Sequence, residues 1–306
     1  MPAVLIDGES VAAKIKKELI VKINELKASR KKGPLLAAVQ IGENPASMVY
    51  IKNQQKSCEE VGIEYKLHSL PAESTEKQVV EYIQGLNVID EISGIILQMP
   101  LPSGMDTAKV QQVIAAEKDV EGVTYANMGR LLFGNAAIAP CTAMAVIELI
   151  NSLGIPLKGK EAVVVGHSAI VGKPAALFLL SSATESATTT VCHIATVGLK
   201  QHTLRADILI VACGKVGLIR KDMVKPGAIV IDVGINRIPV LDEKGNTVLN
   251  EKGKPKMKTV GDVEFDEVKN VAGYITPVPG GVGPVTTVLL LRNTVELFQQ
   301  QEFVGK

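Results

Sequence analysis

The sequence predicts an α/β protein of two domains, of which the C-terminal one is Rossmann-like with a parallel sheet. Short apolar stretches alternate with amphipathic helical stretches along the chain, which is the pattern of βαβ units. The length of 306 residues exceeds the roughly 250 residues above which one core usually splits into two. Apolar residues make up 46% of the chain and Trp is absent, so the cores consist mainly of aliphatic side chains, as in parallel sheets covered by helices.

The first cycle of elements begins with an amphipathic helix over 10–30. Val11, Ile15 and Leu19 recur there at helical spacing, and Ser10 is expected to cap the first turn. Further along the first cycle, strands are expected at 34–42, 64–70 and 93–102, and helices at 46–61, 75–87 and 107–116.

The second cycle begins near residue 141. A strand, a glycine turn and a helix are expected within 161–180, followed by strands within 187–195, 206–214 and 227–236 and by an exposed hairpin or loop over 238–259. The final helix, 286–301, has few partners in this cycle. We therefore expect a first domain of residues 1–141 completed by 285–306, and a dinucleotide-binding domain of residues 142–284.

Composition excludes several classes of function. The 33 basic and 32 acidic residues leave a net charge of +1, which argues against a nucleic-acid or membrane-surface partner. No apolar run reaches the ~18–20 residues of a membrane span, so we expect a soluble, cytoplasmic protein. The four cysteines are widely spaced without a CxxC pair, and no metal site is predicted.

The segment "VVVGHSAIVGKP" has the form of a dinucleotide-binding turn. Gly166 follows an apolar strand directly, but Ser168 stands where the second glycine of GxGxxG belongs and Gly172 comes one residue late. A strand–turn–helix without a ligand is the alternative. At the end of the next strand, neither the carboxylate typical of NAD sites nor an arginine for a 2′-phosphate is present. His167 and His193 are the nearby polar side chains, and the choice between NAD and NADP stays open.

Several motifs, in this order and spacing, resemble the bifunctional methylenetetrahydrofolate dehydrogenase/methenyltetrahydrofolate cyclohydrolase family. The motifs are "NPASMVYIKNQQKSCEEVGI", "GIILQMPLP", "EKDVEGV", "PCTA", "VVVGHSAIVGKP", "GAIVIDVGIN", "VGDV" and "YITPVPGGVGPVT". The resemblance implies two domains around a cleft, NAD or NADP on the C-terminal domain, a tetrahydrofolate derivative as substrate, and a homodimer. The implied activity is oxidation of 5,10-methylenetetrahydrofolate to the 5,10-methenyl form, followed by hydrolysis to 10-formyltetrahydrofolate.

The resemblance also implies the site residues. Tyr50 would stack on the folate rings, Gln98 lies at the end of a strand, and Glu121 replaces the family's aspartate with a longer arm. The family's catalytic lysine is here Gln54. The catalytic residues implied are Tyr50, Gln54, Gln98 and Glu121; the folate-binding residues are Tyr50, Gln98, Glu121, Pro277, Gly280 and Gly281; and the nucleotide-binding residues are Gly166, His167, Ser168, Val171, Gly172, His193 and Ile235.

Helix geometry indicates that no neighbouring lysine replaces the missing one. Gln54 lies four residues after Tyr50 and so shares its helix face, whereas Lys52 and Lys56 point roughly 120–200° away. We therefore expect a dehydrogenase whose cyclohydrolase activity is weak or lost. The alternatives are a fully bifunctional enzyme and a catalytically quiet relative that binds nucleotide or folate.

Overall fold

The computed structural model describes residues 2–42, 45–242, 245–250 and 253–301. The chain divides into two compact units. Residues 12–141 and 286–306 make up the folate-side unit, and residues 1–11 and 142–285 make up the nucleotide-side unit. The two names refer to the ligands that the sequence leads us to expect and are used below for the units. Among the described residues, no helix combines the length and apolar character that a membrane crossing requires.

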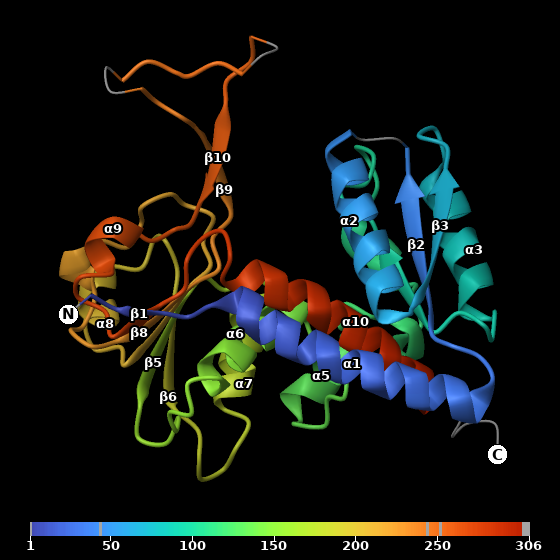
Figure 1. Ribbon diagram of the computed structural model, residues 1–306, viewed down its shortest axis with the longest axis horizontal. Helices are drawn as coiled ribbons and strands as arrows, with labels where there is room; N and C mark the ends of the chain where they lie inside the picture. Colours follow the sequence, from blue (N-terminus) through green and yellow to red (C-terminus); the bar gives the residue numbers. More distant parts are fainter. Residues whose placement is uncertain (1, 43–44, 243–244, 251–252, 302–306) are drawn as a thin grey trace. The chain divides into compact units, whose positions relative to one another are not determined.

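The folate-side unit is built on a three-stranded parallel sheet of order β3-β2-β4. Its core is aliphatic: Val39 of β2 is fully buried with Val79 and Ile83 of α3. In Figure 1, α2 and α3 flank this sheet. Its strands and helices are α1 (Gly8–Arg30), β2 (Leu35–Ile41), α2 (Pro45–Val61), β3 (Glu64–Leu70), α3 (Glu76–Asn87), β4 (Gly94–Leu97), α4 (Thr107–Gln111), the 3₁₀ turn Ala116–Lys118, α5 (Tyr125–Leu132) and α10 (Val282–Gln300).

The long helices α1 and α10 run beside each other in the folate-side unit (Figure 1). Lys22 of α1 contacts Glu296 of α10 at 2.5 Å, and the Arg30 guanidinium donates to the Phe298 carbonyl at 2.8 Å. The guanidinium also lies 4.9 Å from the centroid of the Phe298 ring. The last helix is thus attached to the first one by polar and cation–π contacts as well as by apolar packing.

The nucleotide-side unit is built on a six-stranded parallel sheet of order β1-β11-β8-β7-β5-β6. Apart from Glu161 at the start of β5 and Asp232 at the end of β8, the strands β5, β7 and β8 are apolar and buried, as is typical of parallel sheets. The elements are β1 (Val4–Leu5), α6 (Cys141–Asn151), β5 (Glu161–Val165), α7 (Gly172–Leu179), β6 (Thr188–Cys192), α8 (Leu199–Thr203), β7 (Ile208–Val211), the 3₁₀ turn Lys221–Met223, β8 (Ile229–Asp232), β9 (Asn236–Pro239), β10 (Met257–Val260), α9 (Phe265–Val268) and β11 (Tyr274–Ile275).

The segment expected as an exposed hairpin or loop contains the antiparallel pair β9–β10. Backbone hydrogen bonds continue the pairing outward, for example from the Val240 N–H to the Lys256 carbonyl at 2.8 Å. The pair forms the arm that extends from this unit in Figure 1.

Three sequence expectations differ from the structure. Residues 1–11, expected in the first domain, belong to the nucleotide-side unit because β1 pairs in parallel with β11. The first long helix begins at Gly8, and the carboxylate of Asp7 rather than Ser10 accepts the N–H groups of its first turn. The helix expected over 107–116 ends at Gln111 and is followed by the separate 3₁₀ turn.

Candidate functional site

The centre of the folate side is a pair of buried amides. Gln54, on α2, is 6% exposed, and Gln98, the residue after β4, is 8% exposed. The Gln98 Nε2 donates to the Gln54 Oε1 at 2.8 Å, and the Tyr65 hydroxyl donates to the same oxygen at 3.0 Å. Burial raises the pKa of the Tyr65 phenol, which keeps it a donor. The side-chain carbonyl of Gln54 is therefore occupied by two protein donors.

The neighbouring side chains of α2 are exposed. The Tyr50 ring is 71% exposed and so offers its face to a ligand. Lys52 and Lys56 are both exposed, and the Lys56 ammonium lies 3.9 Å from the Glu60 carboxylate of its own helix, with 76% of the lysine side chain exposed. The buried polar position on this helix is thus held by Gln54, and neither lysine is buried with it.

Glu121 lies on the loop that follows the 3₁₀ turn. Its side chain is partly buried. Burial, with a smaller contribution from the negative charge of Asp119, raises the pKa of the Glu121 carboxyl to about 7. A carboxyl with such a pKa changes its protonation state near neutral pH, as groups at binding and catalytic sites often do.

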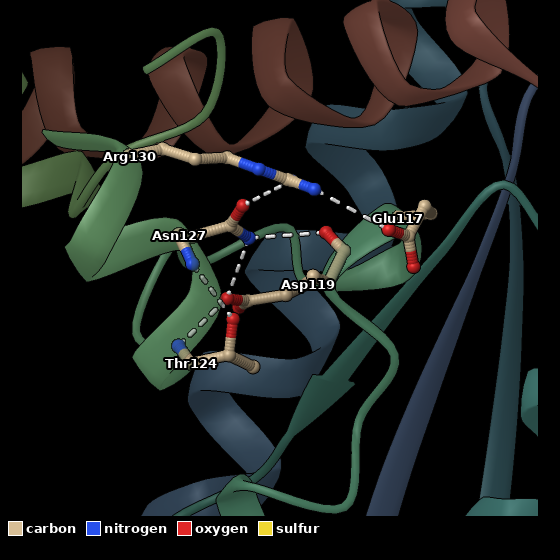
Figure 2. A network of polar contacts seen from close by, with 6 residues as sticks. Glu117, Asp119, Thr124, Asn127 and Arg130 are labelled. Atoms are coloured by element: carbon tan, nitrogen blue, oxygen red, sulfur yellow. Dashed lines mark hydrogen bonds and ion pairs between the residues drawn. The ribbon is translucent and has the colours of Figure 1, made fainter. Parts of the chain in front are cut away.

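Asp119 holds the loop that carries Glu121. It is 1% exposed and accepts three hydrogen bonds, from Gly122 N, Thr124 N and Asn127 Nδ2, at 2.9, 2.8 and 3.0 Å. Figure 2 shows the carboxylate and the Asn127 amide directed toward each other, with Arg130 reaching the outer side of that amide. Because these donors come from both the loop and α5, the loop is attached to the helix that follows it.

Asn127 links Asp119 to residues nearer the protein surface. Its amide also donates to the Ala116 carbonyl at 3.0 Å, and its carbonyl accepts from the Arg130 guanidinium at 2.9 Å. The outermost contact, between Arg130 and Glu117 at 3.5 Å, is solvent-exposed and so contributes little to stability.

Helix α10 supports the same region from the other side. The Asn293 side-chain amide donates to the carbonyls of Val120 and Ala139 at 2.8 and 3.3 Å. The Cys141 thiol also donates to the Val120 carbonyl, at 3.4 Å. The residue immediately before Glu121 is therefore held by segments far apart in the sequence.

The nucleotide side contains a tightly packed glycine turn. Gly166 has a φ of +127°, and a Cβ atom there would lie 2.2 Å from the Ala212 carbonyl oxygen. A Cβ atom at Gly172 would lie 2.0 Å from the Gly166 carbonyl oxygen. The turn lies at the carboxyl end of β5, where the strand order reverses between β6 and β7. Such a switch point is where open parallel sheets bind ligands.

The other nucleotide-binding candidates gather around this turn. His167 and Ser168 are exposed on it, and Val171 immediately precedes α7, whose first turn has no side-chain cap. The Lys173 N–H donates to the Ser168 carbonyl at 3.1 Å, and Pro174 has no N–H. The Gly172 N–H is therefore the one in this first turn that can meet a phosphate. The His193 ring, after β6, meets the His167 ring edge-on at a centroid distance of 5.1 Å. Ile235, after β8, is 70% exposed. The residues present fit a dinucleotide.

The remaining folate-binding candidates also lie in the nucleotide-side unit. Pro277, Gly280 and Gly281 follow β11. The Gly8 N–H donates to the Gly280 carbonyl at 3.0 Å, and a Cβ atom at Gly8 would lie 1.8 Å from the Gly281 carbonyl oxygen. The structure thus brings Gln54 and Gln98 together in one unit, and places the glycine loop against the start of α1 in the other.

Two buried aspartates of the nucleotide-side unit accept hydrogen bonds from backbone N–H groups. The Asp262 carboxylate accepts from the N–H groups of Cys213 and Gly214, at 2.6 and 2.8 Å, just after β7. Asp232, at the end of β8, accepts from the N–H groups of Asp262 and Val263 at 3.0 and 2.9 Å. Burial raises the pKa of Asp232 to about 6.

Sequence reasoning did not identify Tyr65, Asp119, Asp262 or Gly8 as site-forming residues. Asp119 and Asp262 lie within the motifs "EKDVEGV" and "VGDV", and each directly precedes a valine. An aspartate beside an apolar residue is a usable signal for buried N–H groups nearby. Tyr65 follows a plain strand pattern, and only the register of β3 beside β2 places it near α2.

Comparisons with known proteins match one family along nearly the whole chain. Residues 6–121 match the family model for the tetrahydrofolate dehydrogenase/cyclohydrolase catalytic domain, and residues 140–302 match the model for the NAD(P)-binding domain of the same family. The bifunctional protein FolD of Moorella thermoacetica is 47% identical over 97% of this chain and 99% of its own length. The FolD protein of Polaromonas naphthalenivorans is 46% identical over 97% of this chain and 98% of its own.

Solved structures give the same result. The crystal structure of the bifunctional enzyme FolD from Campylobacter jejuni has a TM-score of 0.88 and 42% identity, covering 97% of this chain and 99% of that one. The Trypanosoma brucei enzyme, solved with NADP and an inhibitor, has a TM-score of 0.87 and 37% identity, covering 98% of both chains. The chain therefore belongs to the tetrahydrofolate dehydrogenase/cyclohydrolase family of one-carbon folate metabolism.

Proposed function

We propose that this protein oxidises 5,10-methylenetetrahydrofolate to 5,10-methenyltetrahydrofolate with NAD or NADP, and hydrolyses the product weakly or not at all. The observation that carries the proposal is the buried amide of Gln54, whose carbonyl accepts from Tyr65 and Gln98. The two FolD relatives described above are named as bifunctional, so the proposed loss of one activity would distinguish this chain from them.

The oxidation needs positioning rather than proton transfer. The methylene carbon loses a hydride, and the two folate nitrogens stabilise the resulting cation. NAD or NADP, when bound, supplies the hydride acceptor. The chain has only to bind and align the substrate. The exposed Tyr50 ring offers a stacking face, and Gln98 and Glu121 offer polar groups for the pterin.

The hydrolysis needs protons to move. Water must add to the methenyl carbon and lose a proton, and a ring nitrogen must gain one as its C–N bond breaks. A positioned acid–base group typically contributes about 10²–10⁴-fold. The Gln54 amide does not titrate, and its carbonyl already accepts two hydrogen bonds. It can donate to a ligand but cannot take a proton from water.

A second candidate function is full bifunctionality, with Glu121 as the acid–base group. The observation in its favour is the pKa of about 7 that burial gives this carboxyl. Such a group can both take and give a proton near neutral pH. The two candidates therefore differ in whether the hydrolytic step retains a titrating group.

The test is an assay of both reactions on one preparation of the purified protein. We expect dehydrogenase turnover, followed as reduced nucleotide, to exceed cyclohydrolase turnover, followed as loss of methenyltetrahydrofolate, by about 10²-fold or more. Comparable turnover numbers would refute the proposed loss and favour Glu121. No hydride transfer to either nucleotide would point to a quiet binding protein.

The variant Gln54→Lys should raise cyclohydrolase turnover at least about tenfold, because it restores an amine at the buried position. Gln55→Lys is the matched control, since Gln55 is exposed on the next position of the same helix. If both variants respond equally, the gain comes from charge on the helix rather than from the buried site.

A further inference from the structure

We propose that this chain uses NAD in preference to NADP, because apolar side chains and an imidazole form the surface that meets the adenosine ribose. The proposal rests on the proposed function in that a dinucleotide is the hydride acceptor. The proposal goes further by stating which of the two dinucleotides the site selects.

The β5–α7–β6 unit locates this surface. In such units the pyrophosphate lies at the start of the helix and the ribose hydroxyls lie beside the carboxyl end of the second strand. Here the second strand is β6, which ends at Cys192. The edge-on contact between the His167 and His193 rings joins the glycine turn to the segment after β6. Residues 193–197 are therefore the ribose-facing segment.

The ribose-facing segment presents apolar side chains to solvent. Ile194 is 58% exposed and Val197 is 94% exposed. The Thr196 hydroxyl oxygen accepts from the His193 N–H at 2.9 Å, so it is used within the segment. NADP differs from NAD by a 2′-phosphate, which carries up to two negative charges and is usually met by arginine or lysine. Apolar side chains do not replace the water that this phosphate would lose.

The Nδ1 atom of His193 is used within the segment, because the Ala195 N–H donates to it at 3.1 Å. The other ring nitrogen, Nε2, is therefore the one that the imidazole offers to a ligand. A single N–H donor suits a ribose hydroxyl, which accepts one hydrogen bond and donates another.

The cations nearest in the chain are engaged or placed elsewhere. The Lys200 ammonium contacts the Asp222 carboxylate at 2.6 Å. The Arg205 guanidinium donates to the Thr190 hydroxyl of β6 at 3.5 Å, and its positive charge also acts on the Cys192 thiol, so it is engaged along the strand. Lys173 belongs to the first turn of α7, on the side of the pyrophosphate.

The first test compares the two dinucleotides on the unmodified protein. We expect kcat/KM for NAD to exceed that for NADP by about tenfold or more, the difference that one charge-assisted hydrogen bond makes. Equal or higher kcat/KM for NADP overturns the proposal. Calorimetric binding of each nucleotide without folate tests the NAD preference and the dehydrogenase activity separately. Tighter binding of NAD without turnover refutes only the dehydrogenase activity. Binding of neither nucleotide refutes both proposals.

The second test adds a cation to the ribose-facing segment. Ile194→Arg should raise kcat/KM for NADP by about tenfold and make adenosine 2′,5′-bisphosphate a stronger competitor than ADP. Leu180→Arg is the matched control, because Leu180 is also exposed but follows the opposite end of α7. An equal response of the two variants, or none, shows that residues 193–197 do not meet the ribose and overturns the proposal.

Discussion

At the scale of single residues, the folate side of this protein combines a side chain that cannot titrate with one that titrates near neutral pH. Gln54 provides a fixed amide, and Glu121 a carboxyl whose pKa burial raises to about 7. Binding that depends on the ionised Glu121 should therefore depend on pH in the physiological range.

We expect KM for methylenetetrahydrofolate to rise as the pH falls through about 7, because a protonated Glu121 loses one acceptor for the N–H groups of the pterin. The measurement is KM from about pH 6 to about pH 8. Glu121→Gln should have a high KM without this pH dependence. A wild-type KM that is flat across this range would show that the carboxyl is ionised throughout or does not bind the substrate.

Asp119 gives a second prediction at this scale. Asp119→Ala removes three hydrogen bonds. The Gly122 N–H keeps the backbone carbonyl of residue 119 and the Asn127 amide keeps the Ala116 carbonyl, but the Thr124 N–H loses its acceptor, at a cost of about 1–3 kcal/mol. We expect thermal unfolding at a temperature lower by several degrees, and a KM for folate that rises more than kcat falls, because the loop carrying Glu121 loses its attachment.

The control for Asp119 is Glu117→Gln, which removes only the exposed ion pair between Glu117 and Arg130 at the outer end of the same network. It should change the unfolding temperature by about a degree or less. Similar shifts for the two variants would mean that the buried carboxylate does not hold the loop.

At the scale of elements, the glycine turn between β5 and α7 is closely packed. The Ser168 hydroxyl accepts from the Val171 N–H at 3.2 Å, and neither Gly166 nor Gly172 has room for a Cβ atom. Gly172→Ala would place a Cβ atom 2.0 Å from the Gly166 carbonyl oxygen, so the first turn of α7 must shift. We expect nucleotide binding, measured by calorimetry, to weaken at least about tenfold.

Gly85→Ala is the control for that variant. A Cβ atom there has no neighbour within 4 Å, and alanine in the helix α3 should stabilise the protein by about 0.5–1 kcal/mol. Unchanged nucleotide binding in Gly172→Ala would mean that the turn does not hold the phosphates.

Most elements could be predicted from the sequence because their apolar periodicity is local. The strand Leu35–Ile41 and the helix Glu76–Asn87 lie within the ranges expected for them. The strand Val4–Leu5 could not be predicted, since two residues carry no periodicity and the partner strand lies some 270 residues later. Asp7 displaced Ser10 as the cap because the choice between adjacent polar residues depends on where the preceding strand ends.

The candidate site residues also fall into those that a local motif identifies and those that it does not. Motifs identified Gln54, Gln98 and Glu121, whose roles remain proposals. Tyr65, in contrast, reaches Gln54 only through the pairing of β3 with β2, which no local pattern reveals. Residues that hold other residues in place are the ones that sequence reasoning missed.

At the scale of the whole molecule, the chain passes between its two units three times. Residues 1–11 complete the sheet of the nucleotide-side unit before the folate-side unit begins, and residues 286–306 return to the folate side at the end. Each unit is therefore assembled from two separate stretches of sequence, and β11 lies between β8 and β1 rather than at an edge.

The position of β1 has a consequence for synthesis on the ribosome. This strand emerges first, but its hydrogen-bonding partner, β11, emerges only when most of the chain has been made. A gene cut after codon 141 would separate them, exposing one edge of β11 in the downstream fragment and leaving α1 without α10 in the upstream one. The halves of this protein are thus unsuited to separate expression, and a graft of either onto another enzyme would have to carry both of its stretches.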